Sequence, residues 1–358
     1  MFAKQKTYID YVLILITCVV LLYSIFYNWI FVLCLTIPIV LAINKKIKIL
    51  ILLFYGLFSI IPIFVYLIIK DYCIFEHIPN DFIVNKLVNF VNDNYKDNTS
   101  AIILLICFGM KSNHESWIIY NETKHLSIVY LTSIGGLQIS FLKLLINKVV
   151  RNKKASIIVN FIVIGFYSYV LSFRSGILRV LLCLIISSTM SRWIKNKNNR
   201  LALSGLFTIF IEPSCVFNYG FCLSYLCTFY VIWIYENKIN PLLEMIFINL
   251  GCIFISIPFL AKMEGVISFN SIVFSIGFNY IFIVLFIWYI FTFYLVFLAP
   301  LHDLLANSLF LVINTIYEHN IEIKINKMLK STEAIFYFST FWIFNLINSY
   351  NNKKIKIN

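Results

Sequence analysis

Long apolar runs follow one another along most of the chain, and they constrain its fold more than any other feature. Apolar residues make up 61% of the 358 positions and charged residues 13%, whereas soluble domains average roughly 45–50% and about 25%. The chain therefore lacks the polar surface needed to cover a water-soluble particle of its size. We expect an all-α polytopic integral membrane protein with about 10–12 transmembrane or re-entrant helices. A soluble enzyme, a secreted disulfide scaffold and a disordered regulator are excluded.

The individual runs predict where the helices lie, because about 20 apolar residues are needed to cross the hydrocarbon layer. Several runs are shorter than this, and 271–298 is long enough to contain a break. The predicted spans are 9–27, 29–43, 49–69, 125–147, 155–173, 176–191, 201–217, 221–235, 242–260, 271–298, 303–317 and 333–347.

Clusters of lysine and arginine predict the orientation of these helices, since basic residues near helix ends are enriched on the cytoplasmic side. An N-terminus in the cytoplasm places nearly every cluster inside. We therefore expect a multi-pass protein of the cytoplasmic membrane with both termini in the cytoplasm, and much of the net charge of +13 is an orientation signal. The clusters predicted inside are Lys45, Lys46 and Lys48; Lys148, Arg151, Lys153 and Lys154; Arg192, Lys195, Lys197 and Arg200; and Lys353, Lys354 and Lys356.

The spacing of the runs divides the chain into four segments. Residues 1–69 are predicted as N-terminal transmembrane helices, 70–124 as an external amphipathic or interfacial segment, 125–300 as a transmembrane core, and 301–358 as C-terminal helices with a basic cytoplasmic tail. In the external segment, residues 82–91 repeat apolar side chains at three- and four-residue steps, which is typical of a helix lying along a membrane surface. The apolar run 101–109 is too short to cross and suits a re-entrant or interfacial segment.

Motifs for bond-making chemistry are missing from the sequence. The five histidines lack metal-site spacing, and the nine cysteines form no C-x-x-C pair. The sequence has neither a Walker A lysine loop nor a G-x-S-x-G elbow. We therefore expect that the chain is not an enzyme and holds no metal or cofactor.

Charged residues inside apolar helices are the first candidates for a functional site, because each costs about 2.5–3.5 kcal/mol at a helix centre. Arg179 should face a protein or water-filled interior, and Arg174 lies a turn nearer the outer interface. Glu212 precedes Pro213, which removes a backbone donor and breaks or ends a helix. A helix broken at membrane depth is tolerated only where it lines a cavity or is covered by protein.

A pair of glycines is the second candidate feature. Gly135 and Gly136 lie within an apolar run and are followed by the polar Gln138. Two interpretations stay open: a close helix contact through small residues, or a locally unwound segment beside a conduit.

These residues carry a resemblance to a known family. The stretch YLTSIGGLQIS (130–140) resembles the HLLAISGLHIS-type signature of the ComEC/Rec2 competence family, the membrane channel of bacterial DNA uptake. SGILRVLLCL (175–184) is similar to the S-x-L-R-A helix of that family, with Arg179 at its arginine. The segment 201–226 is similar to "DP…GFQLSF", with Glu212 at the aspartate, then Pro213, Gly220 and Ser224. The order and spacing of the blocks, with SIPF at 256–259, agree over residues 101–298.

The resemblance implies a channel core that passes single-stranded DNA across the cytoplasmic membrane, without the external OB-like and metallo-β-lactamase-like domains of the family. It implies a separate helicase-like motor, a DNA receptor and a separate nuclease. Contact with membrane lipid is expected from the apolar runs, and a homodimer is the candidate assembly. The residues that it implies as pore-lining or substrate-contacting are Arg179, Gln138, Gly135, Gly136, Glu212, Pro213, Gly220 and Ser224. Arg174 joins these candidates because of its charge beside an apolar run.

The chain also departs from the family pattern. Tyr130 and Gln138 replace the two signature histidines, and Cys222 replaces a glutamine. A role that requires imidazole is therefore not implied. The alternatives are a membrane-embedded enzyme acting on lipid-linked sugars, a degenerate ComEC-like paralogue with a structural role, and a small-molecule transporter.

Overall fold

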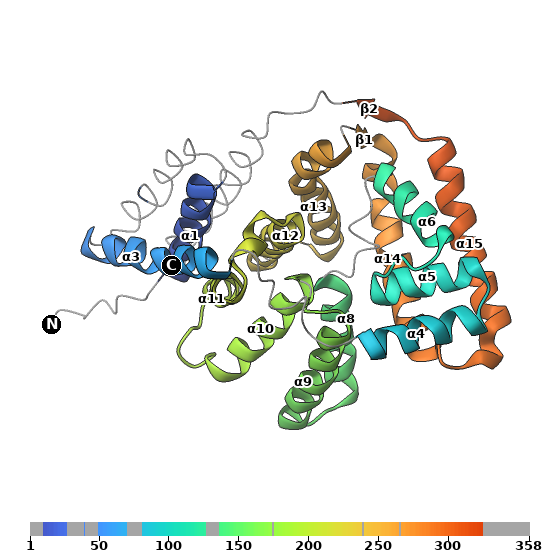
Figure 1. Ribbon diagram of the computed structural model, residues 1–358, viewed down its shortest axis with the longest axis horizontal. Coiled ribbons are helices and arrows are strands. Elements are labelled where there is room, and N and C mark those ends of the chain that lie inside the picture. Colours follow the sequence, from blue (N-terminus) through green and yellow to red (C-terminus); the bar gives the residue numbers. More distant parts are fainter. Residues whose placement is uncertain are drawn as a thin grey trace. The chain divides into compact units, whose positions relative to one another are not determined.

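In the part of the chain that it describes, the computed structural model is a set of helices with one pair of three-residue strands (Figure 1). It describes residues 10–26, 39, 49–69, 81–126, 136–173, 175–237, 240–264 and 266–324. The helices are α1 (Tyr11–Phe26), α3 (Ile49–Ile69), α4 (Asp81–Asn94), α5 (Asp97–Phe108), α6 (His114–His125), α8 (Gly136–Val149), α9 (Lys153–Val170), α10 (Ser175–Thr189), α11 (Lys197–Ile211), α12 (Tyr219–Glu236), α13 (Pro241–Glu264), α14 (Phe269–Thr292) and α15 (Ala299–Glu318). Two 3₁₀ turns, η2 (Pro213–Phe217) and η3 (Val296–Leu298), and two strands, β1 (Val266–Ser268) and β2 (Glu322–Lys324), complete the described elements.

The helical class predicted from the apolar runs is confirmed, apart from the short antiparallel pair β1–β2, in which Ile267 faces Ile323. The run 271–298 contains the expected break, because α14 ends at Thr292 and η3 leads into α15. The run 125–147 begins at the last residue of α6, and its residues 136–147 lie in α8, which extends to Val149. The predicted spans 29–43 and 333–347 lie outside the described residues, apart from residue 39.

Length and composition single out the helices that can cross a bilayer. Within the described residues, two helical segments are long and apolar enough, Lys153–Val170 and Val296–Glu318. Other apolar helices, such as α1 and α5, have fewer than 18 residues. The number of spans and their orientation therefore stay predictions.

The chain divides into two compact units. The first comprises Met1–Ile74, Leu182–Lys238 and Ser331–Asn358, and the second comprises Phe75–Leu181 and Ile239–Lys330. Of the described helices, α1, α3, α11 and α12 belong to the first unit, and α10 contains the boundary. The four-segment division predicted from the sequence stays a prediction.

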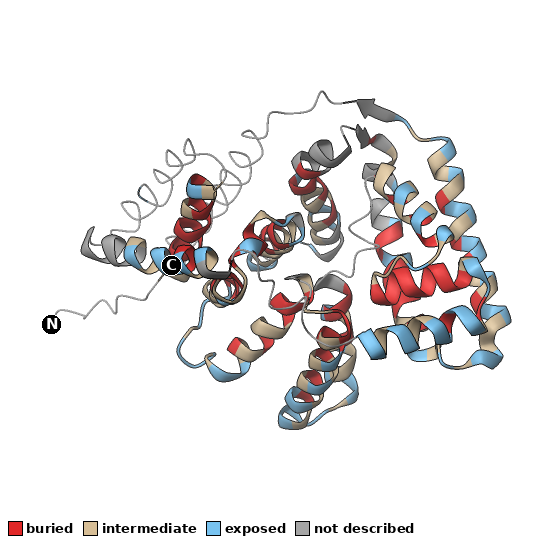
Figure 2. Cartoon of the chain, viewed as in Figure 1, coloured by how far each residue is buried: buried red, intermediate tan, exposed pale blue. Residues whose placement is uncertain are grey.

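The first unit is built around α1, which packs on α3 and α11. Every residue from Val12 to Val20 is buried, because the helix is apolar all round (Figure 2). Asp10 caps its start by accepting the N–H of Val12 at 3.2 Å. Gly205 of α11 permits a close approach, since a Cβ there would lie 3.1 Å from the side chain of Leu15 and 3.3 Å from that of Tyr225.

The second unit is built around α5, which packs on α4, α6, α14 and α15. Every residue from Thr99 to Phe108 is at most 3% exposed (Figure 2). Gly109 ends the helix in the left-handed region at φ 59°, where glycine is favoured. The helix is therefore a core element of its unit. Its re-entrant or interfacial placement in the membrane stays a prediction.

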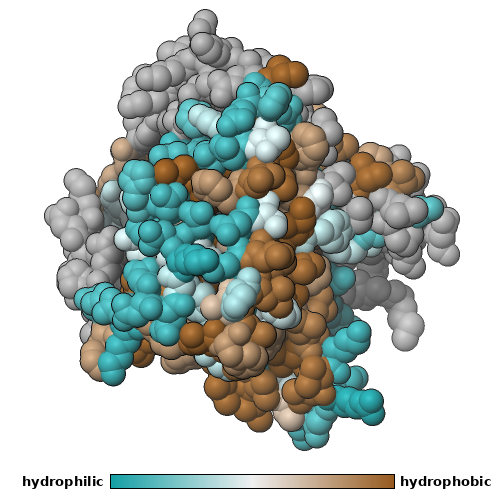
Figure 3. Space-filling view, turned by 90° about the vertical axis from the view of Figure 1, so that its right-hand side faces the viewer, coloured by the Kyte–Doolittle hydropathy of each residue, from teal (hydrophilic) through white to brown (hydrophobic). Residues whose placement is uncertain are grey.

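Several helices expose apolar faces. On α9 the exposed side chains Ile158, Ile162 and Phe166 recur every four residues. On α15, Leu304 and Leu311 are exposed two turns apart. Figure 3 views the side of the molecule on which α15 lies, and hydrophobic side chains form a broad area there beside a hydrophilic one.

Candidate functional site

The break between α11 and α12 lies in the block that resembles the competence signature. Glu212 leaves the helical region with φ −141° and ψ 85°, as expected of a residue before proline. Pro213 opens η2, and Asn218 starts α12 by accepting the N–H of Gly220 at 2.8 Å. The sequence Glu-Pro followed by Asn therefore encodes the interruption locally.

Glu212 and Pro213 have different surroundings at this break. Pro213 is buried, whereas Glu212 is half-buried and its Oε1 accepts the hydroxyl of Ser214 at 3.3 Å. The carbonyl of Glu212 accepts the N–H of Cys215 at 3.1 Å. A carboxylate is thus held at the end of an apolar helix by the turn that follows it.

Buried hydroxyls from the helices on either side of the break, α11 and α12, lie close together. The Tyr225 hydroxyl lies 3.3 Å from Ser204 Oγ and 3.2 Å from Thr208 Oγ1. Cys183 donates its thiol to Ser204 Oγ at 3.3 Å. Ser224, the neighbour of Tyr225, is half-buried. Polar groups from α10, α11 and α12 therefore meet inside an otherwise apolar unit.

Two polar candidates are buried in the second unit. Arg179 of α10 is 6% exposed and lies between the buried Leu178 and Val180. Gln138 of α8 is 4% exposed. A guanidinium stays charged in proteins, so its burial requires compensation by polar groups or water. The pairing of Arg179 with Glu212 stays a prediction, because the two residues belong to different units.

The remaining candidates are less defined. Gly136 is the first residue of α8, and Gly220 is exposed near the start of α12. Gly135, Arg174 and the substituted signature position Tyr130 lie outside the described residues. The structure therefore brings Glu212, Pro213, Gly220 and Ser224 into one unit and Gly136, Gln138 and Arg179 into the other.

A polar cluster that the sequence analysis missed lies where α5, α14 and α15 meet. His302 is completely buried, with Nε2 3.1 Å from Thr292 Oγ1 and its ring 5.4 Å from that of Tyr95. The adjacent Asp303 accepts the hydroxyl of Thr99 and pairs with Lys96 at 3.0 Å. The sequence feature that could have revealed this cluster is the pair His302-Asp303 at the start of the apolar run 303–317.

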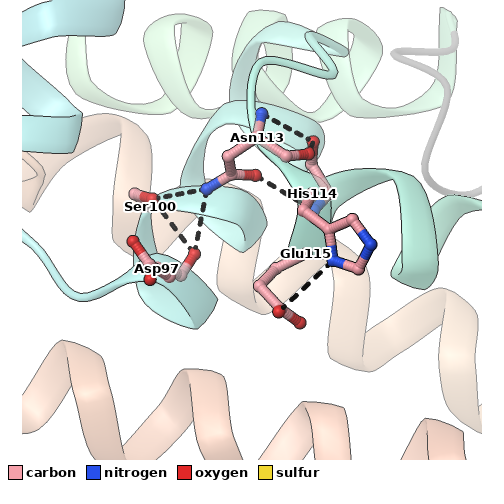
Figure 4. A network of polar contacts seen from close by, with 6 residues as sticks. Asp97, Ser100, Asn113, His114 and Glu115 are labelled. Carbon is pink, nitrogen blue, oxygen red and sulfur yellow. Dashed lines mark hydrogen bonds and ion pairs between the residues drawn. The ribbon is translucent and has the colours of Figure 1, made fainter.

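A second polar network joins the starts of α5 and α6 (Figure 4). Asn113 caps α6, and its Nδ2 donates to the Asp97 carbonyl at 3.2 Å and to Ser100 Oγ at 2.9 Å. His114 and Glu115 lie 3.7 Å apart. These contacts hold the loop between the two helices, which is a structural task. Among the described residues, no three His, Cys, Asp or Glu side chains group as a metal site.

Comparison with known proteins assigns the family. The profile described as "Competence protein" matches residues 106–350, which is more than half of the chain. The chain belongs to the Competence family, and the resemblance seen in its sequence is confirmed.

A curated relative is also similar to the chain in sequence. The chain is 21% identical over 203 residues to "Uncharacterized protein MG316" of Mycoplasma genitalium (strain G37), covering 56% of this chain and 54% of the relative. The match thus spans about half the length of that curated relative. No solved structure matches the chain.

Proposed function

We propose that the chain is a multi-pass protein of the cytoplasmic membrane that conducts single-stranded DNA during DNA uptake. The observation that carries this proposal is the family match over residues 106–350, because it includes the blocks that contain Arg179, Glu212 and Ser224. The exposed apolar faces of α9 and α15 support a lipid environment.

The polar candidates support a wetted path. Buried polar groups inside apolar helices are costly and mark functional positions in membrane proteins. Arg179 supplies a fixed positive charge for phosphate, and Gln138 and Ser224 supply neutral hydrogen-bonding groups. The half-buried Glu212 marks a helix interruption of the kind tolerated beside a cavity or under protein cover.

The chain itself would do no chemistry on DNA. Its sequence has no Walker A loop, so a separate helicase-like motor would supply the energy and a separate nuclease would degrade the second strand. A DNA receptor would deliver the substrate. The proposal includes a homodimer as the candidate assembly.

A structural role in uptake is the second candidate function. It is favoured by one observation, the replacement of the signature histidines by Tyr130 and Gln138. In that case the chain would be required for assembly and Arg179 would not matter for passage.

Uptake of labelled DNA by cells with and without the chain tests the proposal. We expect cells lacking it to bind DNA at the surface but to internalise none. Internalised DNA at the normal level without the chain would contradict the proposal.

Substitution at Arg179 separates the two candidate functions. We expect Arg179→Leu to lower internalised DNA at least about tenfold, because a charge-assisted contact contributes about 1.5–3 kcal/mol. Arg179→Lys keeps the charge and should retain part of the uptake. Normal uptake by Arg179→Leu at equal membrane levels would favour the structural role.

A further inference from the structure

The turn between α8 and α9 carries a concentrated positive charge. Lys148, Arg151, Lys153 and Lys154 are all exposed there. Between Glu122 and Glu212 the sequence contains no acidic residue, so the turn has no acidic neighbour along the chain. Within the described part of the chain, these four side chains form no ion pair. The charge is therefore available to an external anion.

Hydrogen bonds hold this turn in place. Asn152 starts α9 by accepting the N–H of Lys154 at 3.0 Å. Asn147, at the end of α8, accepts the hydroxyl of Ser156 at 2.5 Å and the side-chain N–H of Asn160 at 2.8 Å. Since Ser156 and Asn160 are buried, the two helices are joined next to the turn. The basic residues sit at the end of a fixed hairpin.

The positive charge continues into an apolar stripe on α9. Lys154, Ile158, Ile162 and Phe166 follow at four-residue steps and so share one face of the helix. The three apolar side chains are 59%, 65% and 60% exposed. Val149, inside the basic turn, is 80% exposed. Exposed apolar groups beside exposed cations match the boundary between hydrocarbon and headgroups.

The length of α9 agrees with that placement. Its 18 residues span about 27 Å at 1.5 Å per residue, close to the roughly 30 Å of a hydrocarbon core. With the stripe in the acyl chains, Lys153 and Lys154 reach the level of the lipid phosphates. Lysine side chains near helix ends extend toward that level.

We propose that the α8–α9 turn is a binding surface for anionic phospholipid headgroups. The phosphates would contact Lys148, Arg151, Lys153 and Lys154, and the acyl chains would lie on the stripe of Ile158, Ile162 and Phe166. The proposal rests on the membrane location proposed above and does not depend on passage of DNA. Nucleic acid is less favoured as the occupant, because residues 147–155 contain no aromatic side chain on which a base could stack.

Lipid titration of the full chain in detergent micelles tests this surface. Dioleoyl phosphatidylglycerol and dioleoyl phosphatidylcholine are the probes, and bound lipid is counted by native mass spectrometry. One variant replaces Lys148, Arg151, Lys153 and Lys154 with Gln. The matched control, Lys148→Arg, Lys153→Arg and Lys154→Arg, keeps every charge at the same positions.

The wild type and the Arg control should bind phosphatidylglycerol at least about tenfold more tightly than phosphatidylcholine, since each basic residue near an anionic surface contributes about fivefold. The Gln variant should lose this preference. If the fourfold Gln variant lacks the helical circular dichroism of the wild type, the single variant Lys154→Gln is measured instead. Its affinity for phosphatidylglycerol should fall about fivefold.

Three results would overturn the proposal. The first is equal affinity of the wild type for the two lipids, and the second is an unchanged preference in the Gln variants. The third is tighter binding of a single-stranded oligonucleotide than of phosphatidylglycerol, lost in the Gln variants, which would assign the turn to nucleic acid. Neither readout involves DNA uptake, so failure of the channel proposal would be seen separately.

Discussion

Glu122 is the acidic side chain of α6 with the least favourable surroundings for its charge. Burial, followed by the charges of Glu115 and Glu318, raises its pKa above the ordinary value of 4.5. Its Oε2 is buried and has no hydrogen-bond partner. The folded protein therefore favours the protonated carboxyl more than the unfolded chain does.

This raised pKa predicts how stability changes with pH. Between pH 4.5 and the raised pKa, the folded state binds more protons than the unfolded state, so stability falls as pH rises through that window. Glu122→Gln should raise the melting temperature at pH 7 and should lose this advantage below pH 4.5. Thermal unfolding in detergent across this pH range measures it. Glu115→Gln provides a comparison with a smaller effect on the pKa of Glu122, since the Glu115 charge is a lesser cause of that shift than burial. This variant also alters the contact with His114. A melting temperature of Glu122→Gln below that of the wild type at pH 7 would contradict this prediction.

The buried polar residues differ in how far the sequence predicts them. Arg179 is recognisable as a candidate because a charge inside an apolar run is costly wherever the run lies, and the structure buries it. Its role toward DNA stays a prediction. His302 and Asp303 are not recognisable in this way, because Asp303 meets Thr99 from 204 positions away. Only the tertiary fold brings such groups together.

Helix α11 packs closely at a single small residue, Gly205. Gly205 is surrounded by the side chains of Leu15 and Tyr225, whereas a Cβ added to Gly165 of α9 would meet no atom within 4 Å. The two glycines thus offer matched sites for the same substitution.

Alanine at these two sites should have opposite effects. Gly205→Ala should destabilise the protein by about 1–3 kcal/mol, because it overpacks a filled contact. Gly165→Ala should stabilise it by up to about 1 kcal/mol, because alanine is the better helix former. Melting temperatures of the two variants, measured together, check the signs. Equal changes in melting temperature for the two variants would contradict the close packing of α1 against α11 at Gly205.

The helices themselves were partly predictable. The run 49–69 matches α3, and the run 201–217 covers most of α11 but continues through η2. The burial of α5 was not predictable, since a nine-residue apolar run fits a surface, a re-entrant loop or a core equally well. Which of these holds depends on the neighbouring helices α4 and α6 and on α14 and α15, which are distant in sequence.

At the scale of the whole molecule, the distribution of basic residues predicts a specific topology. Residues 70–124 should lie outside the cytoplasmic membrane, and the α8–α9 turn should lie inside, since its basic cluster is retained in the cytoplasm. A phosphatase that is active only outside should therefore be active when fused after Asn92 and inactive when fused after Asn152. A reporter that fluoresces only in the cytoplasm should give the reverse pattern. Activity after Asn152 would contradict the orientation.

The central claim, that single-stranded DNA passes along this chain, is tested most directly by crosslinking during uptake. A photoreactive side chain is placed at position 138, 179 or 224, with position 162 on the exposed stripe of α9 as the control. DNA blocked at its trailing end holds the strand in transit. We expect DNA crosslinks at one or more of the first three positions and none at position 162. DNA that enters cells without crosslinking at positions 138, 179 and 224 would contradict the claim.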